Sequence, residues 1–287
     1  MKEMFKKSAT CAFAVTSALF TFVPESFFHI VRWIPAQAVQ KRMIESGITE
    51  IEIDTVISRV LCFATIWVIT AIGYGIYKAI RRSVKIKGDN YAIEIKYGDI
   101  FKEKKCKTVI NFDECYTTKI GNKPCEIKAE SICGQYLQGE GKNTNIQQLI
   151  SCSQIPLERR KSRFQNRISY KPGSIVVDRN NLLLAFATLD ENGRARFFTL
   201  DEYIDCLSTM WKQIELNCEQ QDVCVPILGA GLTKFEGGNG ASLSQQQLLE
   251  LMIWSYRLSP HKIKSPYKLR IVCKKCDGFS LNNIEGL

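Results

Sequence analysis

Three short segments of this chain combine glycines with small polar side chains in a way that suits phosphate binding. They are Gly98-Asp99-Ile100, residues 131–136 and residues 226–235. Glycines in a loop between a strand and a helix allow backbone N–H groups to converge on phosphate oxygens. None of the segments has the Lys-Ser/Thr pair that follows the glycines of a Walker-type loop. Each also has a purely structural interpretation, in which the aspartate caps a turn and the glycines form a tight connection.

The histidine and cysteine patterns argue against metal-dependent or histidine-based chemistry. The chain has two histidines, His29 and His261, and twelve cysteines without framework spacing. Cys273 and Cys276 form a single C-x-x-C pair, with no second pair and no matching histidines. A structural zinc site needs about four ligands. We therefore expect no metal site and no histidine-based catalysis, and we expect thiols that stay reduced in a cytoplasmic domain.

From about residue 83 onward, short strands alternate with amphipathic helices. Alternating or continuous apolar runs predict strands at residues 91–95, 108–110, 182–189, 195–198, 223–228 and 269–272. Capping sequences, Thr199 with Glu202 and Ser244 with Gln247, predict the starts of two helices. This succession predicts an α/β domain with a partly parallel sheet. Ligands of such sheets bind beyond the carboxyl ends of the strands, where the three glycine-containing segments fall.

The first eighty residues contain two apolar stretches. Eighteen residues, 60–77, carry no charged side chain, and as a helix at about 1.5 Å per residue they would span ~27 Å, close to the ~30 Å core of a bilayer. The other stretch, residues 8–23, is shorter and follows a basic start, so a cleaved signal peptide competes with a retained helix. We expect transmembrane helices at about residues 8–24 and 57–80, in a membrane region of residues 1–82 followed by a soluble domain of residues 83–287.

The charges that flank these stretches predict their orientation. Lysines precede the first stretch, basic residues follow the second, and residues 25–54 between them carry three basic and five acidic side chains. The positive-inside rule therefore places both basic flanks, and the soluble domain, in the cytoplasm of a multi-pass protein. In the second stretch Ala71, Gly75 and Ala79 form a ridge of small residues that lets helices approach closely, which favours a homo-oligomer.

The net charge of +10 favours an anionic partner, such as a phosphate ligand or the anionic inner leaflet. Basic residues cluster at 159–171, but only Phe164 and Tyr170 are interleaved with them. Single-stranded nucleic acids are bound by stacking on aromatic side chains, so we expect no nucleic-acid partner.

Taken together and in this order, the segments resemble a macro domain, the ADP-ribose-binding α/β module. The resemblance covers about residues 93–272, and its most telling pieces are residues 97–101, 109–112, 131–135, 173–174 and 225–232. The domain is most similar to the divergent macro-like domain of Thoeris anti-phage effectors. The pair of membrane helices matches the membrane-bound class of these effectors. The resemblance implies a mixed sheet flanked by helices.

The resemblance also implies a receptor rather than an enzyme, with no catalytic residues and no cofactor, located in the bacterial inner membrane. In that class a TIR-domain protein makes an ADP-ribose-derived signal, the macro-like domain binds it, and the helices compromise the lipid bilayer by a pore or by general disruption. Asp99 would accept a hydrogen bond from the adenine amino group, and Asp113 stands where an Asn is expected at the distal ribose. The residues expected to bind the ligand are Gly98, Asp99, Ile100, Asn111, Asp113, Gly134, Gln135, Gly229, Ala230, Gly231, Leu232, Thr233 and Lys234.

Two other functions remain open at this point. A membrane-tethered hydrolase of ADP-ribosyl groups would need a general base near the distal ribose, and Asp113 or Glu114 has the right residue type. A tethered nucleic-acid binder would use residues 159–167, and its affinity would fall steeply with salt. The exact nucleotide and the number of subunits also remain open.

Overall fold

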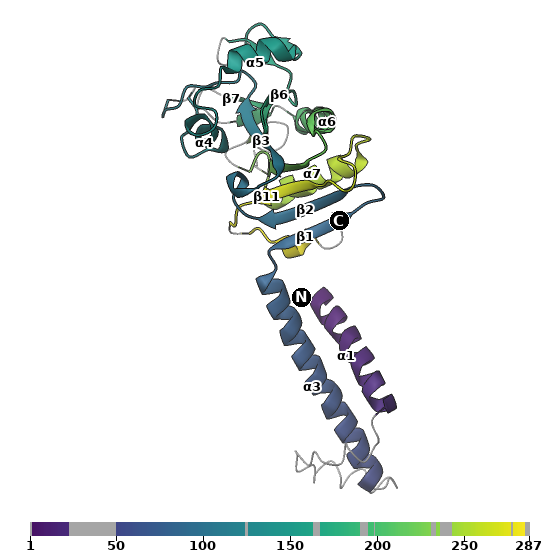
Figure 1. Ribbon diagram of the computed structural model, residues 1–287. Helices are drawn as coiled ribbons and strands as arrows, with labels where there is room; N and C mark the ends of the chain where they lie inside the picture. The colour runs from purple at the N-terminus through teal and green to yellow at the C-terminus, as the bar shows by residue number, and fades with distance from the viewer. Residues whose placement is uncertain are drawn as a thin grey trace. The chain divides into compact units, whose positions relative to one another are not determined.

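The computed structural model describes residues 2–22, 50–123, 126–162, 167–189, 195–197, 199–230, 234–235, 243–276 and 278–284 (Figure 1). The chain divides into two compact units, Met1–Arg81 and Arg82–Leu287. This division lies next to the boundary expected after residue 82.

The first unit contains two helices, α1 (Lys2–Phe22) and α3 (Glu50–Ile80). Among the described residues one helical segment, Arg59–Ile80 of α3, is long and apolar enough to cross a bilayer. The apolar part of α1, Ser8–Phe22, is shorter. By length and composition the structure thus supports a single span, where the sequence predicted two.

A stripe of small residues on α1 packs against α3. The stripe consists of Ser8, Ala12 and Thr16, which are spaced one helical turn apart and are almost completely buried. Among the described elements, α3 makes by far the most extensive contact with α1. The indole Nε1 of Trp67 in α3 donates a hydrogen bond to the hydroxyl of Ser8 at 3.3 Å. Small side chains bring two helix backbones close together, and an interhelical hydrogen bond adds to the contact.

The second unit is built on a mixed sheet that contains nine strands among the described residues. Its order is β1-β2-β11-β9-β3-β7-β8-β10, with β6 paired to β7. Neighbours from β2 to β7 are parallel, whereas β1, β6 and β8 each pair antiparallel with a neighbour. The bounds are β1 Ser83–Lys87, β2 Ala92–Tyr97, β3 Cys106–Asp113, β6 Ile175–Asp178, β7 Asn181–Leu189, β8 Ala195–Phe197, β9 Asp222–Pro226, β10 Lys234–Phe235 and β11 Leu269–Cys273. A separate pair is formed by β4 (Leu157–Arg159) and β5 (Ser169–Tyr170).

Helices cover both faces of this sheet, as Figure 1 shows for α4 and α6. Alternate residues of β7 divide between the two cores, because side chains of a strand point to opposite faces. Leu182 and Leu184 pack with α6 (Leu200–Asn217) and α7 (Gln245–Leu258). Leu183 and Ala185 pack with α4 (Ile132–Gln138) and α5 (Ile146–Ser153). The predicted α/β class with a mixed sheet flanked by helices is therefore confirmed.

The predicted helix starts and the hairpin are also found. The Thr199 hydroxyl accepts from the backbone N–H of Glu202 at the start of α6, and Ser244 with Gln247 forms a complete capping box at the start of α7. The hairpin predicted around residues 182–198 is the antiparallel pair β7–β8, whose connecting residues lie outside the described part of the chain.

Candidate functional site

A cleft of about 360 Å³ lies beyond the carboxyl ends of β2, β3, β9 and β11. Parallel strands end at the same edge of a sheet, so the loops that follow them meet there. The cleft is lined by Gly98, Asp99, Ile100, Phe101, Asn111, Glu130, Ser131, Ile132, Gln135, Phe186, Ala195, Pro226, Ile227, Gly229, Ala230, Gln245, Val272 and Lys274. Parts of all three glycine-containing segments are thus brought together.

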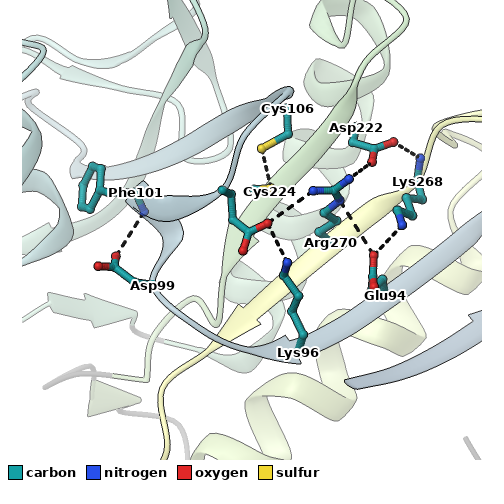
Figure 2. A network of polar contacts seen from close by, with 10 residues as sticks. Glu94, Lys96, Asp99, Phe101, Cys106, Asp222, Cys224, Lys268 and Arg270 are labelled. Atoms are coloured by element: carbon teal, nitrogen blue, oxygen red, sulfur yellow. Dashed lines mark hydrogen bonds and ion pairs between the residues drawn. The ribbon is translucent and has the colours of Figure 1, made fainter. Parts of the chain in front are cut away.

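Asp99 lines the cleft and also caps a short helix. One of its carboxylate oxygens accepts a hydrogen bond from the backbone N–H of Phe101 at 3.1 Å, which starts the 3₁₀ helix η2 (Ile100–Lys102) (Figure 2). The N–H of Gly98 donates to the carbonyl of Cys273 at 3.0 Å, which ties this loop to the end of β11. The interpretation of Asp99 as a cap is therefore confirmed, and the residue also lines the cleft.

Asn111 supplies the most informative polar atom of the cleft. It lies near the end of β3, and its side-chain Oδ1 is buried without a hydrogen-bond partner among the described residues. An acceptor that is removed from water and left unpaired costs about 1–3 kcal/mol. Buried polar groups are normally paired, so an unpaired one in a cleft indicates a place where a ligand donor would fit.

The residues at the start of α4 have different roles: one caps the helix, one lines the cleft and one packs against the backbone. The Ser131 hydroxyl accepts from the N–H of Gly134 at 3.0 Å, and the Gln135 side chain lines the cleft while donating to the carbonyl of Glu130 at 2.9 Å. A Cβ on Gly134 would lie 2.1 Å from the carbonyl oxygen of Lys128. Gly134 is therefore required by close backbone packing, and it does not line the cleft.

The loop after β9 is anchored by the two large helices. The Tyr203 hydroxyl of α6 donates to the carbonyl of Leu228 at 3.1 Å, and the N–H of Leu228 contacts the sulfur of Met252 in α7 at 3.3 Å. Gly229 follows with a φ of +83°, a left-handed conformation that favours glycine. Gly229 and Ala230 line the cleft.

The remaining residues predicted in this loop lie wholly or partly outside the described part of the chain. Gly231, Leu232 and Thr233 lie outside the described residues. Lys234 belongs to β10, where its backbone pairs with Arg196, and its side chain also lies outside the described part.

Asp113, predicted near the distal ribose, is engaged in a turn at the end of β3. Its carboxylate accepts from the N–H and the hydroxyl of Thr117 at 2.7 and 2.9 Å, and from the N–H of Cys115 at 3.3 Å. Burial raises the pKa of Asp113, an effect that these hydrogen bonds and the Arg167 guanidinium partly offset. The carboxyl does not line the cleft.

Several residues of the cleft carry no signal in the sequence. Phe186 belongs to the apolar run of β7, and Gln245 is the first residue of α7. The Gln245 amide donates to the carbonyl of Lys274 at 3.2 Å, so two segments remote in sequence close one side of the cleft. Of these residues, only Lys274 could have been suspected from the sequence, because it is basic and follows a predicted strand.

A charged network lies beside η2 on the sheet (Figure 2). The Arg270 guanidinium contacts Glu103 at 3.3 Å and Asp222 at 2.5 Å, and Lys96 contacts Glu103 at 2.7 Å. The N–H of Glu103 also donates to the carbonyl of Ile100. The network thus connects β2, β9 and β11 to η2, the helix that Asp99 caps.

A second cavity of about 220 Å³ contains Glu114, the other carboxylate considered for hydrolysis. Its lining mixes both signs of charge, including Lys171, Arg196 and Glu202. Glu114 is almost fully buried there, and it does not line the cleft that contains Asp99 and Asn111. Among the described residues, no group of three or more His, Cys, Asp or Glu side chains is arranged to hold a metal ion.

Comparison with known proteins gives one family and one related protein. The family model for the macro domain of Thoeris protein ThsA matches residues 93–274. A Thoeris protein ThsA from Bacillus amyloliquefaciens (strain Y2) is 28% identical over 200 residues, which are 66% of this chain and 65% of that protein. The chain is thus matched to slightly less than two thirds of the relative's length.

Solved macrodomain structures are more distant. The Oceanobacillus iheyensis macrodomain with ADP has a TM-score of 0.38 and 12% identity, over 67% of this chain and 88% of that one. Thermosipho africanus DarTG in complex with ADP-ribose has a TM-score of 0.38 and 13% identity, over 66% of this chain and 43% of that one.

Proposed function

Because the chain belongs to the family of Thoeris ThsA macro domains, we propose that it is a membrane effector of bacterial anti-phage immunity. In this proposal its macro-like domain binds an ADP-ribose-derived signal made by a TIR-domain protein. Binding favours a homo-oligomer that disrupts the inner membrane. The observation that carries the binding step is the cleft of about 360 Å³, in which the buried Oδ1 of Asn111 has no hydrogen-bond partner among the described residues.

The cleft offers a complementary group for each part of such a ligand. Asp99 would accept from the adenine amino group, and its cap of η2 holds the carboxylate in one orientation. The backbone at Gly229 and Ala230 would approach the phosphates, with Lys274 adding positive charge. A ribose hydroxyl would donate to Asn111 and satisfy its buried oxygen. The cleft thus suits a nucleotide that carries adenine, phosphates and ribose.

The membrane part of the proposal rests on the first unit. The apolar segment Arg59–Ile80 would span the inner membrane, and α1 would return beside it through its stripe of Ser8, Ala12 and Thr16. The hydrogen bond from Trp67 to Ser8 supports this helical hairpin, because such bonds stabilise helix pairs in lipid. Both ends of the hairpin, and the macro-like domain, would then lie in the cytoplasm.

A gate of this kind requires that the ligand bind one state more tightly than the other. A shift from 1:99 to 99:1 needs a difference of about 5.5 kcal/mol. In this proposal, burial of a dinucleotide at a contact between subunits supplies that difference. The proposed oligomer would thus be the state that binds the signal best.

The hydrolase alternative is the weaker one. A hydrolase needs a general base near the reacting sugar, but Asp113 is occupied by the turn at Thr117 and Glu114 lies in the other cavity. The cleft supplies hydrogen-bonding groups without either of these carboxylates. A role in binding without turnover therefore accounts better for the arrangement.

The proposal is tested by calorimetric titration of the full chain in detergent micelles with ADP-ribose, NAD and the products of a TIR enzyme. Saturable binding with unchanged ligand, as seen by chromatography after incubation, is expected. Asn111→Ala should weaken binding about tenfold, the loss of roughly one hydrogen bond to a buried group. Asn180→Ala is the matched control, because Asn180 is exposed in the turn before β7, and it should bind normally.

Two results would contradict the proposal. If none of the nucleotides binds the folded chain, the cleft is not a nucleotide site. If the ligand is consumed during the titration, the chain is an enzyme and the hydrolase interpretation replaces the receptor.

A further inference from the structure

Two cysteine thiols meet in the sheet next to the cleft. Cys106 is the first residue of β3, and Cys224 lies in the middle of the neighbouring parallel strand β9. In the register of these strands Thr108 lies opposite Cys224, so Cys106 is its diagonal neighbour. The two side chains therefore share one face of the sheet.

The two sulfur atoms are unusually close. The Cys224 thiol donates to the sulfur of Cys106 with an Sγ–Sγ distance of 2.7 Å (Figure 2). A disulfide bond is about 2.05 Å long, so a small approach of the two strands would bring the sulfurs to bonding distance. Cys224 is completely buried, whereas Cys106 retains 6% of its surface, which gives a small oxidant access to one of the two.

The surroundings distinguish the two thiols chemically. The hydrogen bond from Cys224 lowers the pKa of Cys106, and the nearby Arg270 guanidinium lowers it further against the opposing effect of burial. The same hydrogen bond, together with burial, raises the pKa of Cys224. The thiolate is the reactive form of cysteine. Cys106 is therefore the attacking group and Cys224 the resolving one.

We propose that Cys106 and Cys224 form a reversible oxidation site whose oxidant is a peroxide. The Cys106 thiolate attacks one peroxide oxygen, the O–O bond breaks, and the leaving hydroxide takes up a proton as water. The resulting sulfenic acid is attacked by the sulfur of Cys224. The S–S bond forms, the S–O bond breaks, and hydroxide leaves with the Cys224 proton as a second water. Two thiols and one hydrogen peroxide give one disulfide and two waters, and a dithiol reductant returns two electrons and two protons.

The position of the pair gives this reaction a structural consequence. Cys106 and Cys224 pack in one cluster with Ile100 and Val272, and both of these residues line the cleft. A disulfide bond between β3 and β9 would therefore constrain the part of the cleft that Ile100 and Val272 line. The chemistry of the thiols does not depend on which ligand the cleft binds, so the site stands apart from the proposed function.

Mass spectrometry tests the proposal on the full chain in detergent micelles. The reduced protein is exposed to hydrogen peroxide, unreacted thiols are alkylated in denaturant, and the digest is searched for linked peptides. Cys106 and Cys224 should appear as one linked pair, lighter by two hydrogen atoms, and dithiothreitol should restore both thiols. Cys206, which is also buried and whose thiol donates to the carbonyl of Phe186, should remain a free thiol.

Variants separate the two roles. In Cys224→Ser the reaction should stop at a Cys106 sulfenic acid that dimedone traps, whereas Cys206→Ser should leave the linked pair unchanged. The proposal is wrong if Cys106 and Cys224 of the unaltered chain stay reduced while the exposed Cys152 is oxidised. It is equally wrong if either thiol pairs with a different cysteine. Because both of these outcomes are measured on the unaltered chain, the test holds even where a variant fails to fold.

Discussion

At Asp99 one carboxylate has both a local and a proposed ligand-binding role. One oxygen starts η2 by accepting from the N–H of Phe101, and the side chain lines the cleft. The two roles can be separated by substitution, because Asn and Ser also cap helices well whereas Ala does not.

We expect Asp99→Asn to keep the cap and lose adenine recognition, since an amide donor would then face the adenine amino group. Its affinity for ADP-ribose should fall about tenfold, corresponding to about 1.4 kcal/mol, while the thermal midpoint of unfolding changes little. Calorimetry and a melting curve measure both quantities. Asp89→Ala, in the exposed turn between β1 and β2, is the control and should bind normally. Unchanged affinity of Asp99→Asn would remove Asp99 from the binding site.

The burial of Asp113 predicts how the stability of the chain depends on pH. Burial raises the pKa of its carboxyl in the folded chain above the unfolded value, so its contribution to stability is fully present below the unfolded pKa and is lost as pH rises through the folded pKa. Asn at this position does not titrate. The free energy of unfolding of the unaltered chain, minus that of Asp113→Asn, should therefore decrease as pH rises above the ordinary aspartate pKa of about 4.

Urea unfolding of the two chains at several pH values measures this difference. The subtraction removes the titration of all groups that the two chains share. A difference that stays constant or increases with pH would show that the turn at Thr117 holds Asp113 as a stabilised carboxylate.

At the scale of the elements, the capping box of α7 connects local sequence to the cleft. Ser244 accepts from the N–H of Gln247, whose side chain returns a bond to the N–H of Ser244. Gln245, the residue after Ser244, lines the cleft, and its side-chain amide donates to the carbonyl of Lys274. The start of α7 therefore determines the position of Gln245 at the cleft.

Ser244→Ala should lower the free energy of unfolding by about 1 kcal/mol, because one backbone donor at the start of α7 loses its acceptor. Urea unfolding followed by circular dichroism measures the change. Ser151→Ala is a suitable control, since Ser151 is exposed within α5 and its hydroxyl donates to the carbonyl one turn earlier. It should change stability by less than about 0.5 kcal/mol. Equal effects in the two variants would show that the cap contributes nothing specific.

At the scale of the whole molecule, the proposal requires chains to associate through their membrane helices. The ridge of Ala71, Gly75 and Ala79 is available for this within α3, because a Cβ added at Gly75 meets nothing within 4 Å in its own chain. A larger side chain there would affect contacts with other copies and leave the fold of the single chain unchanged. The ridge thus allows association to be tested apart from folding.

We expect Gly75→Leu to abolish the growth arrest that follows activation by the TIR partner, while affinity for ADP-ribose in detergent stays unchanged. Gly73→Leu is the matched control, because a Cβ at Gly73 also meets nothing within 4 Å and Gly73 lies off the ridge. Growth of activated cells and calorimetry give the two readouts. Full toxicity of Gly75→Leu, or equal loss in both variants, would exclude packing through this ridge.

Local patterns in the sequence were sufficient for some of the elements, whereas strands such as β1 and β6 were not predicted. The two-sided apolar run of β7, the caps at Thr199 and Ser244, and the uncharged stretch at residues 60–77 each depend on neighbouring residues alone. Strand and helix periodicity and capping are short-range effects, so they can be read before the fold is known. The order of the glycine-containing segments likewise predicted the edge of the sheet where the cleft lies.

Only the tertiary structure decided which side chains of those segments reach the cleft. Gln135 lines it while the adjacent Gly134 packs against the backbone of Lys128, although the two are equivalent in the sequence pattern. Cys106 and Cys224 lie 118 positions apart and touch only because β3 pairs with β9. Such contacts depend on strand order and register, which arise from the packing of the whole domain and leave no periodic signal along the chain.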